Sequence, residues 1–113
     1  MWVRVSIKND ISNENGFLHG YYRKSKKVKG RQIWVNDANA IWYEPIMNTW
    51  VIGRLSEIGS TLAYIVTNNH FPGFTESQSQ WLYHVGNSWK SPSDPSDITV
   101  ACMNGKYLPN ALY

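Results

Sequence analysis

The chain has 113 residues, 17% of them charged, and a formal net charge of +3 at neutral pH. This length suits one domain, and the low charged share excludes a disordered polyelectrolyte. A single cysteine, Cys102, excludes an intrachain disulfide, so the core must stabilise the fold. Six tryptophans and seven tyrosines favour strands, because aromatic side chains pack well on pleated sheets. We therefore expect one β domain at residues 1–113.

The first third of the chain predicts one strand followed by two irregular segments. Residues 3–7 alternate valine or isoleucine with polar side chains, the pattern of a half-buried strand. Residues 9–16 are rich in Asn, Asp, Ser and Gly and predict a loop. Residues 17–22 resume an extended pattern. They lead into a basic stretch at residues 23–31, which predicts a long hairpin loop or a ragged turn.

The centre of the chain alternates apolar segments with turn residues. Four strands are expected, at residues 32–36, 40–44, 49–53 and 62–67. Turns or connections are expected between them, at residues 36–39, 45–48 and 56–61. The fixed φ of Pro45 favours the second turn.

The last third of the chain predicts a loop, a hairpin and a final strand. Pro72 and Gly73 interrupt residues 68–79, which predicts a long loop. The sole helical candidate is one short turn at residues 75–80. A hairpin at residues 81–90, a flexible stretch at 91–97 and a strand at 98–103 follow.

The tryptophan spacing supports a meander. Trp34, Trp42 and Trp50 are eight residues apart, as are Trp81 and Trp89. Eight residues make about one strand and one tight turn, so the indoles are expected to pair across neighbouring strands. The predicted fold is an all-β antiparallel meander of about six to eight strands, closing into a small open barrel or sandwich.

The two ends of the chain echo each other. A strand pattern followed by a glycine and a tyrosine occurs near the N-terminus and again after residue 98. One hypothesis is that residues 98–113 begin a second, truncated repeat. The alternative is that β-proteins reuse such short patterns by chance.

A series of aromatic motifs resembles a known kind of module. The motifs are Gly20-x-Tyr22, Gly30-Arg31-x-x-Trp34, Ile41-x-Tyr43, Trp50-x-Ile52 and Tyr64. They resemble a Trp/Tyr-rich β module that recurs in multidomain eukaryotic proteins, mostly of unassigned function. Gln32 stands where that pattern favours proline. The resemblance implies a small sheet domain used for display or interaction, and it implies no catalytic residue.

Catalytic and metal-binding signatures are missing from the sequence. There is no nucleophile elbow and no phosphate-binding glycine loop, and the three histidines are isolated. Cys102 lies in a predicted strand and is interpreted as a structural thiol. Glu44 lies beside Trp42 and Tyr43, but a glycosidase needs two carboxyl groups across a cleft. We therefore expect no enzyme, no cofactor and no metal, with a glycan-active enzyme kept as an alternative.

Strands that are apolar on both sides suggest a binding surface. Ile33 and Val35 oppose Trp34, so the sheet must close, or one aromatic face stays exposed. The favoured function is a non-catalytic module that binds a protein partner or a carbohydrate through this face. The candidate aromatic binding residues are Trp42, Trp50, Trp89 and Tyr22. The simpler interpretation, favoured for most of the aromatic residues, is that they form the core.

The basic stretch supports the alternative function, binding of nucleic acid or another polyanion. Six of the eleven basic residues lie at residues 23–31, whereas the rest of the chain is slightly acidic. The candidate anion-binding residues are Lys24, Lys26, Lys27, Lys29 and Arg31. A solvated loop is the simpler interpretation. The alternating N-terminus predicts no signal peptide and no membrane insertion, which favours the cytoplasm.

Overall fold

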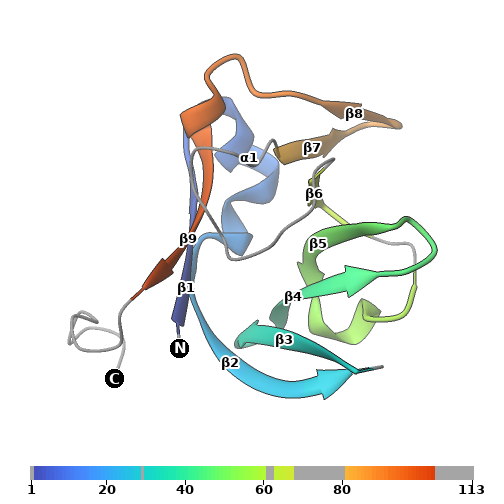
Figure 1. Cartoon of the computed structure of the whole chain (residues 1–113). Helices are drawn as coiled ribbons and strands as arrows, with labels where there is room; N and C mark the ends of the chain where they lie inside the picture. The colour runs from blue at the N-terminus through green and yellow to red at the C-terminus, as the bar shows by residue number, and fades with distance from the viewer. Residues whose placement is uncertain (1, 29, 61–62, 68–80, 104–113) are drawn as a thin grey trace.

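The computed structural model describes residues 2–28, 30–60, 63–67 and 81–103. In this part of the chain, antiparallel strands form one sheet that curls into a half-barrel (Figure 1). This confirms the predicted all-β antiparallel fold. The nine strands are β1 (Trp2–Ile7), β2 (Gly20–Val28), β3 (Arg31–Asn36), β4 (Asn39–Glu44), β5 (Thr49–Arg54), β6 (Ile65–Thr67), β7 (Trp81–Val85), β8 (Ser88–Lys90) and β9 (Ile98–Met103).

The strand order is a meander with one long return. Strands β1 to β8 lie side by side in chain order, and β9 pairs with the free side of β1. The β1–β9 register sets Val5 opposite Val100 and Ile7 opposite Ile98. The segment at residues 98–103 is therefore a strand of the same sheet, joined to the N-terminal strand.

Hairpin geometry makes the central tryptophans alternate between the two faces of the sheet. Cross-strand partners share a face, and the β3–β4 register pairs Trp34 with Ile41. Trp42, the next residue, therefore lies on the opposite face. In the β4–β5 hairpin Tyr43 pairs with Trp50, which returns Trp50 to the face of Trp34. The predicted pairing of indoles on neighbouring strands is thus wrong for Trp42. The rings of Trp34 and Trp50, which share the other face, lie 6.0 Å apart.

The main core lies on the inner face, which we define as the face covered by residues 9–18. Burial of apolar side chains on this face is the main stabilising term of such a fold. Every strand except β8 contributes to it, and Trp50, Tyr64 and Tyr83 pack at its border. The buried members are Val3, Val5, Ile7, Ile11, Leu18, Tyr22, Trp34, Ile41, Ile52, Ile65, Trp81, Ile98 and Val100.

Residues 9–18 form short helical turns, which corrects the loop predicted at residues 9–16 and the extended start predicted for residues 17–22. The turns are η1 (Asn9–Ile11), α1 (Ser12–Asn15) and η2 (Gly16–Leu18), and they lie inside the curve of the sheet (Figure 1). Helical periodicity cannot reveal so short a segment. Burial of Ile11 and Leu18 fixes it, together with a hydrogen bond that Asn39 Nδ2 donates to the Phe17 carbonyl over 2.9 Å.

A second, smaller cluster covers the outer face of the central strands. Its buried members are Ile33, Ala40, Trp42, Val51 and Val66. Met47 from the β4–β5 turn and Ile58 and Ala63 from the β5–β6 connection pack over them. The sheet therefore buries both faces at its centre, because it curls around residues 9–18 on one side and lies under a connection on the other.

The basic stretch is part of the sheet, which corrects the predicted loop. Strand β2 runs to Val28, which pairs with Arg31. A β-bulge between Lys24 and Lys27 inserts one extra residue, so the residues after it change faces. Val28 thereby packs with the outer cluster. The Gln32 amide donates to the Ser25 carbonyl and so satisfies an acceptor at the bulge.

Several sequence predictions fall outside the described residues. They are the loop at residues 68–79 and the helical turn at 75–80. Residue 62 of the strand predicted at 62–67 and residues 104–113 of the possible repeat also lie outside them. In the part of the chain that the structure describes, no helix has the length and apolar character needed to cross a membrane.

A candidate binding pocket on the outer face

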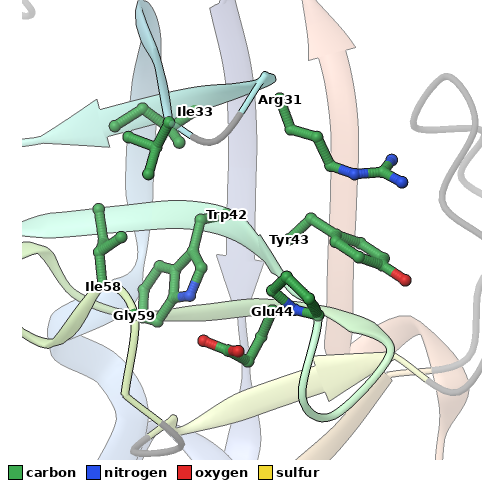
Figure 2. A pocket seen from close by; sticks show the side chains of 9 residues that line it. Arg31, Ile33, Trp42, Tyr43, Glu44, Ile58 and Gly59 are labelled. Atoms are coloured by element: carbon green, nitrogen blue, oxygen red, sulfur yellow. The ribbon is translucent and has the colours of Figure 1, made fainter.

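A small pocket opens on the outer face of the sheet, where β3 and β4 meet the β5–β6 connection. The space between its lining atoms is about 300 Å³, which includes space open to solvent. Figure 2 shows Trp42 and Glu44 between Ile33 and Ile58 on one side and Arg31 and Tyr43 on the other. The lining residues are Val28, Arg31, Ile33, Trp42, Tyr43, Glu44, Pro45, Ile58 and Gly59.

The floor of the pocket contains a buried carboxylate. We define the floor as Ile33, Trp42 and Glu44, the buried lining residues of β3 and β4. Glu44 is the last residue of β4 and is 2% exposed. Its Oε2 accepts a hydrogen bond of 3.1 Å from the backbone N–H of Ile46 in the following turn. Its Oε1 is buried and has no hydrogen-bond partner among the described residues.

The same floor contains an unpaired donor. Trp42 is 2% exposed, and no described residue accepts a hydrogen bond from its indole Nε1. Gly53 of β5, which pairs with Ala40 of β4, has no side chain and so leaves room for the indole. A Cβ at Gly53 would lie 3.1 Å from Trp42 Cη2, closer than an ordinary contact. The packing thus holds the ring in place without satisfying its polar edge.

The acceptor and the donor belong to one site. Trp42 and Glu44 are two residues apart on β4, so they share a face, and both line the pocket. A buried polar atom without a partner costs about 1–3 kcal/mol, and more when it is charged. Native proteins therefore rarely leave such atoms unpaired. A ligand group that donates to Glu44 and accepts from Trp42 would relieve both costs together.

The mouth of the pocket, Arg31 and Tyr43, is cationic and aromatic. The guanidinium carbon of Arg31 lies 4.1 Å from the centre of the Tyr43 ring. The Tyr43 hydroxyl donates to Asn48 Oδ1, and its ring meets Trp50 edge-on at 5.7 Å. Arg31 is exposed. The tyrosine therefore holds an accessible positive charge beside the pocket.

The structure separates the aromatic residues that the sequence proposed as one surface. Trp42 and Tyr22 are buried, which agrees with the interpretation that they are core residues and leaves no exposed face of either ring for binding. Trp50 is half-buried at the border of the inner core. Trp89 is 38% exposed on β8, beside His84. A common aromatic platform does not form, because hairpin registers send these side chains to different faces.

The basic residues lie along the β2–β3 hairpin. Lys24, Lys26 and Lys27 are exposed on β2, Arg31 is exposed at the start of β3, and Lys29 falls outside the described residues. Val28 and Arg31 line the pocket, so this hairpin forms one of its walls. Of the candidate anion-binding residues Arg31 therefore adjoins the pocket, whereas Lys24 and Lys27, opposite Trp34 and Gln32, lie on the other face of the sheet.

The sequence pattern predicts some of the pocket residues but not others. The alternation of Trp42 and Glu44 on one strand predicts that they share a face. Ile58 and Gly59 close the pocket from the β5–β6 connection, and no periodicity marks their position. The described residues contain no group of three or more His, Cys, Asp or Glu side chains able to hold a metal ion.

Comparisons of the chain with protein-family models, with curated proteins and with solved structures found no match. The resemblance to a Trp/Tyr-rich module therefore stays a prediction, and the pocket is the feature of the molecule that indicates a function.

Proposed function

We propose that this domain is a non-catalytic carbohydrate-binding module, and that it holds a sugar hydroxyl in the pocket at Trp42 and Glu44. The observation that carries the proposal is the pair of buried, unpartnered atoms, Trp42 Nε1 and Glu44 Oε1, in one pocket. A hydroxyl both donates and accepts, so one hydroxyl can serve both atoms.

Other ligand groups fit this pair of atoms less well. An ammonium group has donors only and leaves Trp42 Nε1 unsatisfied, while a carboxylate has acceptors only and is repelled by Glu44. A carboxamide could serve both atoms, so an asparagine or glutamine of a partner protein is the rival occupant.

A binding role is favoured over hydrolysis. Glycoside hydrolysis usually needs two carboxyl groups, about 5–10 Å apart across the scissile bond. Among the described lining residues Glu44 is the one carboxylate, and its Oε2 is occupied by the Ile46 N–H. The pocket supplies recognition by hydrogen bonds and contact, without a second acid or base.

Substitutions on the pocket floor test this function. We expect Glu44→Gln to weaken binding of the best oligosaccharide by about tenfold to a hundredfold, since a hydrogen bond to a charged group contributes about 1.5–3 kcal/mol. Trp42→Phe removes the indole donor and should weaken binding by about tenfold. The measurement is a screen on an array of neutral and acidic oligosaccharides, followed by titration calorimetry.

The matched control is Trp89→Phe, which changes an exposed tryptophan on the edge strand β8. It should leave the affinity unchanged. Near-ultraviolet circular dichroism checks that each variant keeps its fold. Failure of the wild-type protein to bind any saccharide on the array would overturn the proposal. If the domain instead binds peptides rich in Asn or Gln, and Glu44→Gln abolishes that binding, the occupant is a carboxamide side chain of a partner protein.

A further inference from the structure

The mouth of the pocket has a positive charge that a neutral sugar does not use. Arg31 lies over Tyr43 at 4.1 Å and is exposed. A guanidinium stacked on a ring keeps its planar N–H edge for a second partner, and that edge matches a carboxylate or sulfate. An anionic group on a ligand in the pocket could therefore pair with Arg31 at the mouth.

The hairpin that carries Arg31 has further basic residues on both faces of the sheet. Lys24 and Lys27 are opposite Trp34 and Gln32 on the inner face, and Arg23 is opposite Val35 on the outer face. Arg23, Lys24, Lys26 and Lys27 are exposed along β2. No acidic residue occurs between Glu14 and Asp37 in the sequence, so this hairpin has no carboxylate of its own. The β2–β3 register places Val28, a lining residue, opposite Arg31. The pocket wall and the basic residues are thus consecutive parts of one hairpin.

We infer that the ligand is an acidic glycan, with uronate or sulfate groups on the sugar chain. One hydroxyl binds at Glu44 and Trp42, and an acidic group on the same or the next ring pairs with Arg31. This inference rests on the proposed function and adds the chemical class of the sugar.

The pocket also explains why a glycan fits better than a nucleic acid. The buried carboxylate of Glu44 repels a phosphate at the floor but accepts a hydrogen bond from a hydroxyl. Acidic glycans carry hydroxyl and anionic groups within one ring, so they can meet a negative floor and a positive mouth together. Nucleic acid, with a phosphate at each nucleotide, matches the basic hairpin alone.

Paired probes test the inference. Oligogalacturonate is compared with its methyl ester, and chondroitin sulfate oligosaccharide with its desulfated form, by titration of the purified domain. We expect the acidic or sulfated member of at least one pair to bind about tenfold more tightly. The logarithm of its association constant should fall linearly with the logarithm of salt concentration. The two pairs separate carboxylate from sulfate as the preferred group.

Arg31→Gln should remove this preference, so that the acidic and neutral members of a pair bind with equal affinity. Arg54→Gln is the matched control, because Arg54 is also exposed and lies over aromatic rings, 4.6 Å from Phe17 and 5.8 Å from Tyr64. It removes the same charge from another site and should keep the preference. If Arg31→Gln does not fold, Arg31→Lys keeps the charge but loses the planar edge, and it should reduce the preference in part.

The outcomes separate the two proposals. Equal binding of the charged and neutral members of both pairs, still dependent on Glu44, overturns the acidic class and leaves carbohydrate binding standing. The acidic class is also overturned if Arg54→Gln and Arg31→Gln reduce the preference for the acidic probe equally, since the change in net charge alone then explains the effect. Single-stranded DNA that binds as tightly as the acidic glycan, with no effect of Glu44→Gln, assigns the hairpin to nucleic acid instead. No saccharide binding at all overturns the proposed function itself.

Discussion

Tyr22 shows how a single hydroxyl ties the helical turns to the sheet. Its ring is fully buried on the inner face, opposite Val3 of β1. Its hydroxyl donates a hydrogen bond of 2.6 Å to the Leu18 carbonyl at the end of η2. Burial raises the pKa of Tyr22 well above its ordinary value of 10, and a hydrogen bond with the Asn39 side chain offsets part of that rise. The residue that the sequence proposed for binding is thus a core residue.

Tyr22→Phe should destabilise the fold by about 1–3 kcal/mol at neutral pH, because the Leu18 carbonyl loses its buried partner. The raised pKa adds a pH dependence. Tyrosine in the unfolded chain ionises near pH 10 while Tyr22 in the fold stays protonated, so its contribution is present below pH 10 and is lost as the pH rises further. Urea unfolding of both proteins from pH 7 to pH 11 should show the difference shrinking above pH 10. A constant difference over that range would contradict this account.

At the scale of the element, turns decide which side chains reach the pocket. The two-residue turn at Asp37–Ala38 and the four-residue turn after Glu44 set the registers that send Trp42 and Glu44 outward. The bulge in β2 then sends Val28 to the same face. The two turns and the bulge each set the pairing register between neighbouring strands. A register shift of one residue exchanges the two faces of a strand.

Two glycines should respond in opposite directions to alanine because their backbone conformations differ. Gly30, in the turn between β2 and β3, has φ +79° and an empty space where a Cβ would lie. Gly30→Ala should therefore cost about 1–2 kcal/mol from backbone strain alone. Gly16 has helical dihedrals, and its added Cβ would make an ordinary contact with Ser12.

Gly16→Ala should accordingly stabilise the fold by about 0.5–1 kcal/mol, because alanine loses less chain entropy on folding. Chemical denaturation of the wild type and the two variants measures both changes. Destabilisation of similar size in both variants would show that side-chain contacts, and not backbone conformation, govern these positions.

At the scale of the whole molecule, the last strand completes the sheet that the first strand begins. Strand β9 pairs along β1, so the two described ends of the chain meet in one core. Pairing segments that are far apart in sequence is entropically costly, and the buried side chains of both strands must compensate for it. If residues 98–103 instead belonged to a separate repeat, β1 and β9 would be energetically independent.

A double-mutant cycle on Val5 and Val100 tests this dependence. Each change to alanine should cost about 2 kcal/mol, since both valines are buried. They are direct cross-strand partners, so the two costs should depart from additivity by at least about 0.5 kcal/mol. Val5→Ala combined with Val51→Ala on the outer face is the control and should be additive. Additive costs for Val5 and Val100 would favour the repeat hypothesis.

The sequence alone predicted most of the strands, because alternation and turn residues are local signals. The hairpin at Asn36–Asn39 and the strands at residues 40–44 and 49–53 follow from such signals. The sequence also marked Glu44 as a carboxylate beside aromatic residues. Local patterns could not show the helical turns at residues 9–18, since they depend on burial against the sheet.

Tertiary structure alone decided which aromatic residues are core and which side chains form a site. Trp42 and Trp89 belong to similar strand patterns, yet one lies under the β5–β6 connection and the other on an edge strand. The pocket needs residues from β2, β3, β4 and that connection to meet at one place. Burial and contact between distant segments depend on how the sheet curls, and the spacing of residues along the chain does not contain that information.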